Sequence, residues 1–212
     1  TAHSSLGHEK RAEDAFETAA GMAPDSPDVR TYRALHYARS RQWERAGPLL
    51  ERVLAETPDR LPALETLAVV RERQDRIAEA VGLRQRIYAL RNPTPAESVQ
   101  LGHLAMKKGD TTLATASFER ARAVQGKDFA NDLELGVLYL AARRYGEARD
   151  CLDRVPEGHP AYPMALFKRA QVSVLLREPD QAVRIAAARA HADTVTRPLI
   201  ERERLFQKPG AP

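Results

Sequence analysis

An alanine that returns every 34 residues constrains the fold of this chain more than any other feature. The alanines are Ala12, Ala46, Ala80, Ala114, Ala148 and Ala182. Twelve residues before each of the last five lies another small residue, namely Ala34, Ala68, Gly102, Gly136 and Ala170. A fixed period of this length is typical of stacked structural units that contact mainly their neighbours. The sequence therefore predicts a series of similar units and argues against one closed globule.

Each unit has the pattern of two helices joined by a turn. Apolar residues follow helical spacing in two segments, with a polar turn between them. The turns are "RSRQ" (39–42), "ERQDR" (72–76), "KKGD" (107–110), "ARR" (142–144) and "REPD" (177–180). Ala, Arg, Leu and Glu dominate the chain while Ile, Thr and Phe are sparse, which favours helix over sheet. We predict an all-α fold, with helices at 61–74 and 77–90 in one of the units.

The small residues have a packing reason. Two antiparallel helices approach closely only where no large side chain separates them, and a bulky residue there would overpack the contact by about 1–3 kcal/mol. We expect Gly102 to face Ala114, and Gly136 to face Ala148, across the two helices of one unit.

At these positions the chain resembles the tetratricopeptide repeat family. The family signature is a Leu-Gly pair, a Tyr three residues later, an Ala, a large apolar residue four further on and a Pro at the end. Residues 101–121 and 135–155 fit it best. The resemblance implies a right-handed solenoid of antiparallel helix pairs with a C-terminal capping helix. Its parts would be a partial repeat at 1–26, full repeats at 27–60, 61–94, 95–128, 129–162 and 163–196, the capping helix at 197–206 and a flexible tail at 207–212.

Four arginines depart from the family pattern. Arg33 and Arg169 stand where Leu is usual, Arg84 stands where a large apolar residue is usual, and Arg189 lies near the end of the last repeat. Long arginine stems can lie along apolar surface while the guanidinium stays in water. We expect that arrangement, or looser packing, at these positions.

No familiar catalytic or metal-binding motif is present. The sequence has no phosphate loop, dinucleotide fingerprint, HExxH, GxSxG or CxxC. Cys151 and His159 are the only candidates for a thiol and base, and we interpret Cys151 as a buried inert thiol. His103 and Met106 lie one turn apart, but two ligands do not make a metal site. The sequence therefore predicts a protein that is not an enzyme and has no catalytic, cofactor or metal site.

Charge and hydropathy limit the partners. The net charge is +4, yet positive and negative residues alternate along the helices, and no polar pair repeats at positions that would read bases. We predict no nucleic-acid partner. No apolar run approaches the ~18 residues of a membrane span, so we predict no direct membrane insertion. The sequence leaves open a cytoplasmic or a periplasmic location, and it leaves open the oligomeric state.

The resemblance also implies a binding groove on the concave side, lined by fixed positions of the first helix in each repeat. Carried over to this chain, those positions are apolar in the C-terminal half. The predicted groove residues are Val99, His103, Met106, Leu133, Val137, Leu140, Phe167, Gln171 and Val174. We single out Phe167 as an anchor for a partner. The alternative is that the helix at 197–206, or another part of the parent protein, covers the groove, because the helix at 162–176 is apolar nearly all round and needs a second mate.

Two function classes follow. The first is a non-enzymatic scaffold that binds a peptide or helix of a partner protein, within a bacterial assembly such as envelope, pilus or exopolysaccharide machinery. The second is a recruitment or substrate-binding arm of a larger enzyme, such as a glycosyltransferase. The repeat phase places Thr1 inside a first helix, so we expect either that the chain was cut from a longer protein or that proteolysis removed its start.

Overall fold

The computed structural model of the protein describes residues 14, 18, 21 and 26–207, and within them the regular structure is helical, with no strand. This confirms the predicted all-α class. The helices are α2 (Pro27–Arg39), α3 (Trp43–Glu56), α4 (Leu61–Arg73), α5 (Ile77–Leu90), α6 (Pro95–Lys108), α7 (Thr111–Gln125), α8 (Asp132–Ala141), α9 (Tyr145–Leu152), α10 (Tyr162–Leu175), α11 (Gln181–Ala190) and α12 (Thr196–Arg202). Short 3₁₀ turns, η1 (Gly126–Asp128) and η2 (Arg204–Phe206), follow α7 and α12.

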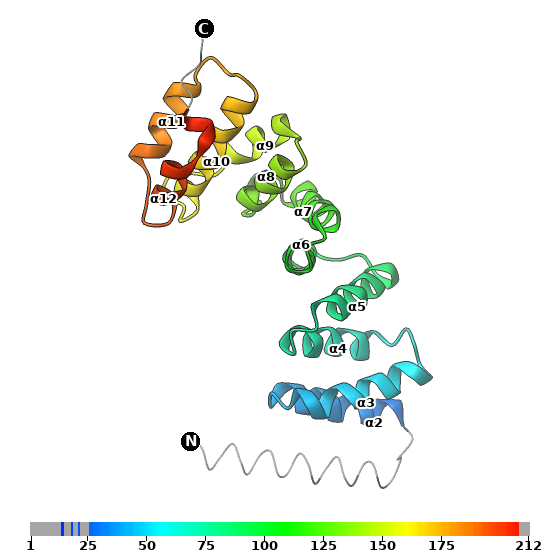
Figure 1. Ribbon diagram of the computed structural model, residues 1–212. Coiled ribbons are helices and arrows are strands. Elements are labelled where there is room, and N and C mark those ends of the chain that lie inside the picture. Colours follow the sequence, from blue (N-terminus) through cyan, green and yellow to red (C-terminus); the bar gives the residue numbers. More distant parts are fainter. Residues whose placement is uncertain (1–13, 15–17, 19–20, 22–25, 208–212) are drawn as a thin grey trace. The chain divides into compact units, whose positions relative to one another are not determined.

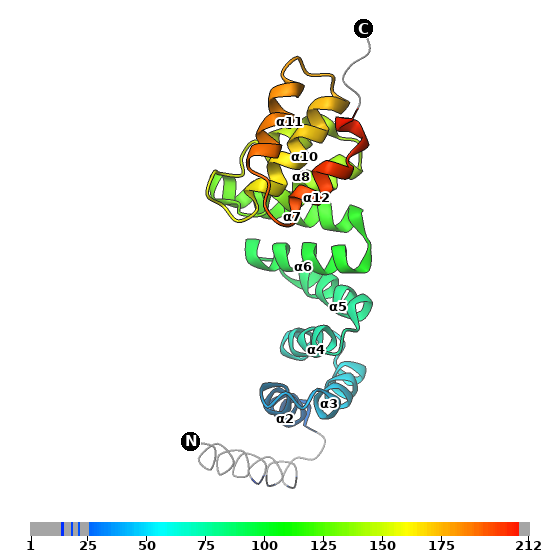
Figure 2. The ribbon, with the colours of Figure 1, turned by 60° about the vertical axis from the view of Figure 1, so that its left-hand side comes forward.

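Consecutive helices pack as hairpins: α2 with α3, α4 with α5, α8 with α9 and α10 with α11 (Figures 1 and 2). The helices predicted at 61–74 and 77–90 are confirmed as α4 and α5. The repeat boundaries and the right-handed sense of the stack stay predictions. Most of the partial repeat predicted at 1–26, and the tail from 208 onwards, lie outside the described residues.

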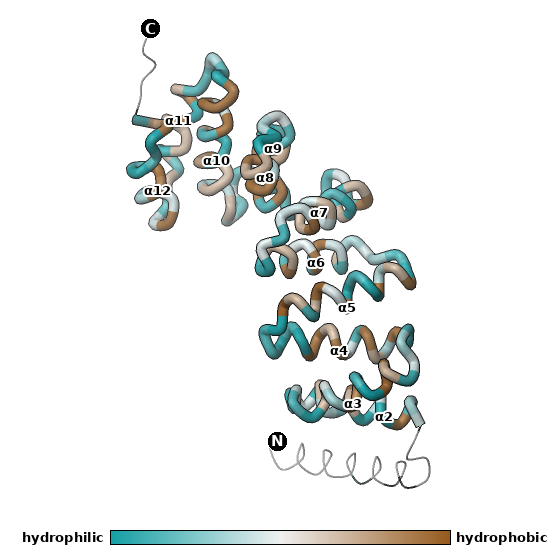
Figure 3. The backbone as a smooth tube through the Cα atoms, turned by 45° about the vertical axis from the view of Figure 1, so that its right-hand side comes forward, coloured by the Kyte–Doolittle hydropathy of each residue, from teal (hydrophilic) through white to brown (hydrophobic). Residues whose placement is uncertain are grey.

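The chain divides into two units. Residues 1–94 and 103–109 form the first, and residues 95–102 and 110–212 form the second, so that α6 contributes to both. In the first unit the core forms where the apolar faces of α2, α3 and α4 meet, around Tyr37, Leu50 and Val70, which are at most 2% exposed. The tube in Figure 3 shows apolar and polar stretches alternating along these helices, as expected for elements that bury only one face.

The turn inside each hairpin is the same. Five residues at the 34-residue step have left-handed backbone, with φ between 55° and 81°: Arg41, Asp75, Gly109, Arg143 and Arg177. In four of these turns the residue after the left-handed one donates its backbone N–H to the carbonyl five residues before it, and this bond ends the helix. One example is the bond from Arg144 N to Tyr139 O, at 2.8 Å. This is the Schellman arrangement for ending a helix. The polar turns predicted from the sequence are therefore confirmed, although only one of the five left-handed residues is a glycine.

The two signature glycines face larger residues than predicted. A Cβ added to Gly136 would lie 2.9 Å from Cγ of Leu152, and one added to Gly102 would lie 2.9 Å from the Phe118 ring. The atoms nearest to the added Cβ thus belong to the residues four positions after Ala148 and Ala114, while the predicted contact of the glycines with those alanines stays a prediction. Both alanines are fully buried, but the glycines make room for the large side chain four residues later.

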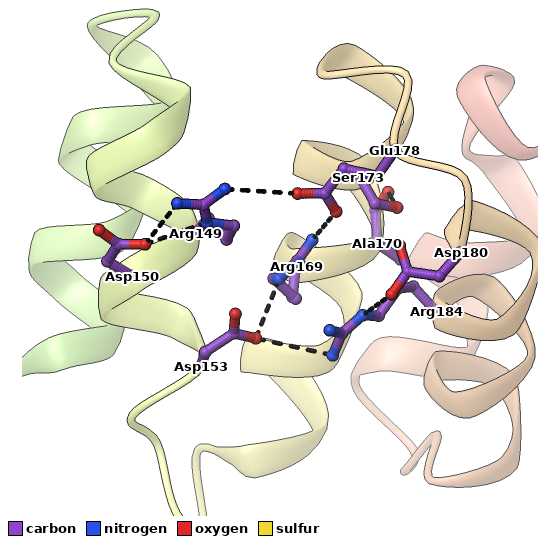
Figure 4. Close-up of polar contacts among 9 residues, drawn as sticks. All are labelled: Arg149, Asp150, Asp153, Arg169, Ala170, Ser173, Glu178, Asp180 and Arg184. Atoms are coloured by element: carbon purple, nitrogen blue, oxygen red, sulfur yellow. Dashed lines mark hydrogen bonds and ion pairs between the residues drawn. The ribbon is translucent and has the colours of Figure 1, made fainter.

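Two of the four arginines that depart from the family pattern have buried side chains that form ion pairs. Arg84 donates from Nε to Glu72 over 2.6 Å and is 7% exposed. Arg169 is 4% exposed and donates to Asp153 over 2.9 Å and to Glu178 over 2.6 Å (Figure 4). The expectation that their guanidinium groups stay in water is wrong, because both side chains are at most 9% exposed and are paired with carboxylates that reach the surface. Arg189 is exposed, as expected.

A polar link between neighbouring hairpins recurs at equivalent positions. Tyr139 donates its hydroxyl to Glu119 over 2.7 Å, and Arg71 donates to Glu51; in each pair the partners are 20 residues apart. The next residue at this position is Ser173, whose hydroxyl donates to the Ala170 carbonyl instead. Arg169, one turn earlier on α10, then supplies the bond to the preceding hairpin.

Candidate functional site

The nine predicted groove residues are divided between the two units. His103 and Met106 belong to the first unit, where both are exposed. The other seven lie in the second unit, on α6, α8 and α10.

In the second unit α8 presents a half-buried apolar stripe. Leu133, Val137 and Leu140 are spaced by four and three residues, so they share one face of the helix, and all three are partly exposed. The opposite face packs into the hairpin through Leu135 and Tyr139, which are at most 4% exposed. Val99 on α6 is also half-buried. The stripe therefore presents apolar surface that the hairpin itself does not cover.

The corresponding face of α10 is covered by the chain itself. Phe167 is 3% exposed, and its ring packs edge-on against Phe206, with 5.9 Å between the ring centroids. Gln171 donates its side-chain N–H to Glu203, and Val174 packs against the same cluster as Ile200. The prediction that Phe167 is an exposed anchor is wrong, because residues of α12 and η2 bury it. Residues of α12 and η2 therefore pack on the face of α10 that carries Phe167.

Local hydrogen bonds set the path of this covering segment. The Asp193 carboxylate accepts the Thr196 N–H over 2.7 Å and the Val195 N–H over 3.0 Å, and these bonds lower the pKa of Asp193. They turn the chain after α11 and start α12. Glu203 accepts the Leu205 N–H over 3.0 Å and starts η2, which brings Phe206 onto α10. The helix predicted at 197–206 is thus observed as α12 and η2, while its role as a cap stays a prediction.

A cavity of about 610 Å³ opens beside the first turn of α8. Its apolar walls include Phe129, Leu133, Val155 and Pro156. The charged or titratable lining residues are Lys127, Asp128, Asp132, Arg154 and His159. Leu133 belongs to both the apolar stripe and the cavity, so the two features are continuous.

Asp132 is the one buried carboxylate in this lining. The residue is 8% exposed, and its Oδ1 atom has no hydrogen-bond partner. The nearest cation in an ion pair with it, Nη1 of Arg154, lies 4.0 Å from Oδ1. Burial raises the pKa of the Asp132 carboxyl, an effect that Arg122 and Arg154 partly offset. Sequence reasoning missed Asp132, because an acidic residue in the first turn of a helix is usually a solvated one that complements the helix dipole.

Cys151 and His159 have separate partners. The Cys151 sulfur is fully buried and accepts a hydrogen bond from Nη1 of Arg122 over 2.9 Å. Burial raises the pKa of the Cys151 thiol to about 11. His159 is exposed, and its Nδ1 accepts the Ala161 N–H over 3.1 Å. The buried thiol predicted from the sequence is confirmed.

Among residues 14, 18, 21 and 26–207, no group of three or more His, Cys, Asp or Glu side chains is arranged to hold a metal ion. Over the same residues, no helix has both the length and the apolar character that crossing a bilayer requires.

Comparison with known proteins places these features in a family. The family model of the tetratricopeptide repeat matches residues 1–60, 99–163 and 133–194. Cellulose synthase operon protein C of Pseudomonas fluorescens (strain SBW25) is 27% identical over 199 residues, which cover 88% of this chain and 16% of that relative. This chain thus spans well under a fifth of the relative's length.

Solved structures agree on the fold. YrrB, described as a TPR protein with an unusual peptide-binding site, has a TM-score of 0.71 at 16% identity, covering 89% of this chain and 98% of YrrB. MamA has a TM-score of 0.61 at 15% identity, covering 77% of this chain and 90% of MamA. Because the family model matches well over half of the chain and the structure repeats the same helical hairpin, this chain belongs to the tetratricopeptide repeat family.

Proposed function

We propose that this chain is a protein-interaction scaffold that receives a peptide or helix of a partner protein on the inner face of α8. The observation that carries the proposal is the apolar stripe of Leu133, Val137 and Leu140, which continues into the cavity beside α8. Apolar surface of this kind, bordered by polar residues, is typical of interaction sites. The fold supports the same function, since tetratricopeptide repeat proteins are generally scaffolds.

The covering of α10 indicates what kind of ligand suits such a face. The segment from Thr196 to Phe206 is amphipathic: Ile200 and Phe206 pack onto α10, while Glu201 and Arg202 are exposed. Helix-in-groove recognition uses the same division between an apolar and a polar face. We infer that the partner supplies an amphipathic helix or an extended apolar segment to α8.

The assembly proposed for the scaffold is a bacterial exopolysaccharide machine. The similarity to cellulose synthase operon protein C supports exopolysaccharide machinery over envelope or pilus machinery. The peptide-binding site in the description of YrrB supports a peptide as the ligand class.

The test compares two substitutions that introduce the same charge. Val137→Asp places a carboxylate within the stripe, and Val183→Asp places one on α11 at a residue that is 68% exposed. The wild-type chain and both variants serve as baits in a lysate of the source organism, with captured proteins identified by mass spectrometry and bait folding checked by circular dichroism. We expect Val137→Asp to lose about 10-fold or more of the specific partner and Val183→Asp to retain it. Equal capture by both folded variants would contradict the proposal.

A further inference from the structure

We propose that the first unit carries a second binding surface, which takes an acidic segment of a partner protein with apolar residues among its carboxylates. The surface consists of the apolar residues Leu35 and Val69 and of three cations, Arg39, Arg73 and Lys107. It belongs to a different unit from the stripe on α8, so it goes beyond the proposed function and does not depend on it.

The apolar part of the surface lies on two neighbouring helices. Leu35 on α2 and Val69 on α4 hold the repeat position that Val137 holds on α8. Their side chains are 38% and 39% exposed, whereas Tyr37 and Val70 on the same helices are buried in the core. Because α2 and α4 contact each other, the two exposed side chains give this unit an apolar strip that is open to a partner.

A cation follows each of these apolar residues by four positions. Arg39 follows Leu35 and Arg73 follows Val69, so each pair shares one side of its helix. Lys107 holds the equivalent position of α6, in the same unit. All three cations, called the cationic row below, are exposed, and none forms a hydrogen bond or ion pair within the described part of the chain. Their charges are therefore available to a partner.

The carboxylates of the same helices do not offset the cationic row. Each acidic residue of α2 and α4 is already paired with an arginine of a neighbouring segment: Asp28 with Arg60, Glu65 with Arg91 and Glu72 with Arg84. The part of α6 that belongs to the first unit, 103–108, contains no acidic residue. The first helices of this unit thus present unpaired cations beside paired carboxylates, which favours an acidic partner.

The fold itself does not require a cation at these positions. Arg39 and Arg73 are the last residues of α2 and α4, where a positive charge also complements the helix dipole. The second unit has Ala141 and Leu175 at the equivalent positions, as the last residues of α8 and α10. Those helices end without a cation there, so helix termination alone does not account for the cationic row.

The apolar strip favours a peptide over a nucleic acid. The sugar-phosphate backbone would satisfy the cations, but it offers no apolar group to Leu35 and Val69. Proteins that bind single strands usually stack the bases on aromatic side chains, and neither of these residues has a ring. A peptide with leucines between its carboxylates matches both the strip and the cationic row.

The experiment measures binding of fluorescently labelled peptides to the 212-residue chain by anisotropy. The probe repeats the triplet Leu-Glu-Glu, and two control peptides of the same length repeat Leu-Gln-Gln and Ser-Glu-Glu. We expect the probe to bind about 10-fold more tightly than the Leu-Gln-Gln peptide, because three surface ion pairs together contribute roughly that factor. The Ser-Glu-Glu peptide should also bind more weakly, since it buries no apolar side chain. Added salt should weaken binding of the probe.

A matched pair of double variants tests the location. Arg39→Glu with Arg73→Glu reverses two charges of the cationic row. Arg120→Glu with Arg189→Glu makes the same change in net charge at two exposed, unpaired arginines of the second unit. We expect the first double variant to lose about 10-fold or more in affinity for the probe and the second to retain it, with folding of both checked by circular dichroism.

Three results would overturn the inference: equal binding of the Leu-Glu-Glu and Leu-Gln-Gln peptides to the wild-type chain, equal loss in the two double variants, or tighter binding of a single-stranded oligonucleotide with the same number of charges. The wild-type comparison keeps the test decisive even if a double variant does not fold. Val137→Asp should bind the probe as the wild-type chain does. Loss of the probe in that variant, with binding retained by Arg39→Glu with Arg73→Glu, would assign the peptide to α8, so that the scaffold function stands and the second surface does not.

Discussion

Arg169 donates from Nε to Oδ1 of Asp153 over 2.9 Å, which joins α10 to the residue that follows α9 (Figure 4). The same guanidinium donates to Glu178 over 2.6 Å. Arg184 lies 3.7 Å from Asp153, so that this carboxylate is shared between two arginines. The buried charge of Arg169 is therefore compensated by two carboxylates and is tied to both neighbouring segments.

Arg169→Ala should destabilise the chain by about 3 kcal/mol or more, because it leaves Asp153 and Glu178 without their buried partner. Arg169→Leu should cost less, since leucine fills part of the volume and is the residue usual in the family. Urea unfolding followed by circular dichroism measures both. The control is Arg189→Ala, at an exposed arginine on α11, which should change stability by less than about 0.5 kcal/mol. Equal losses of stability for Arg169→Ala and Arg189→Ala would show that the ion pairs of Arg169 contribute nothing to the free energy of unfolding.

Gly136→Ala should destabilise by about 1–3 kcal/mol, because the new Cβ would overlap Leu152 at 2.9 Å and press on Cβ of Cys151 at 3.3 Å. Gly146→Ala is the matched control: it lies on α9, has no atom within 4 Å of the added Cβ, and should stabilise by up to about 1 kcal/mol. Thermal unfolding measures both. Combining Gly136→Ala with Leu152→Ala should cost less than the sum of the two single changes. Strict additivity would argue against the close contact.

Arg143→Gly should stabilise the chain by about 0.5 kcal/mol. Arg143 has φ of 59° in the α8–α9 turn, where a side chain costs about 1–2 kcal/mol that glycine avoids, partly offset by the greater freedom of glycine when unfolded. Gly109→Ala, at the equivalent turn position with φ of 81°, should destabilise by about 1 kcal/mol. Chemical denaturation of both variants checks the opposite signs. A loss of stability in Arg143→Gly would mean that the arginine side chain stabilises the turn in another way.

Cys151 should react with iodoacetamide at neutral pH at least about 100-fold more slowly in the folded chain than in the unfolded chain. Burial raises the pKa of this thiol from 9.0 to about 11, which lowers the thiolate fraction by that factor before access is considered. Mass spectrometry of timed samples, with and without urea, gives the two rates. Similar rates would place Cys151 at an accessible position.

Asp132→Asn should gain stability relative to the wild-type chain as the pH rises from 3.5 to 7. Burial raises the folded-state pKa of this carboxyl above its ordinary value, so the folded chain holds the proton more tightly than the unfolded chain. The wild-type chain therefore loses stability as the pH rises through the window between those two values, and the asparagine variant does not. Attraction from Arg122 and Arg154 reduces the rise in the pKa of Asp132, while repulsion from Glu134 adds to it.

The measurement is the difference in melting temperature between the two chains at each pH, in which the titrations of all other carboxylates cancel. A difference that stays constant, or that favours the wild-type chain as the pH rises, would contradict the raised pKa.

The hairpins were predictable from the sequence, and the reason is local. Helical spacing, small residues and polar turns each act over a few residues, and their repetition at 34 residues made the pattern visible six times. The positions of α4 and α5, the buried Cys151 and the repeated turns followed from these short-range rules. The stripe on α8 was found in the same way, because its three residues lie on one helix.

Only the tertiary structure decided the features that join distant segments. Phe167 has the sequence signal of an exposed anchor, and it is buried because η2 returns to place Phe206 against it. Asp132 has the signal of a solvated first-turn acid, yet it is 8% exposed in the folded chain. Periodicity shows which side of a helix is apolar, but what covers that side depends on where the rest of the chain packs.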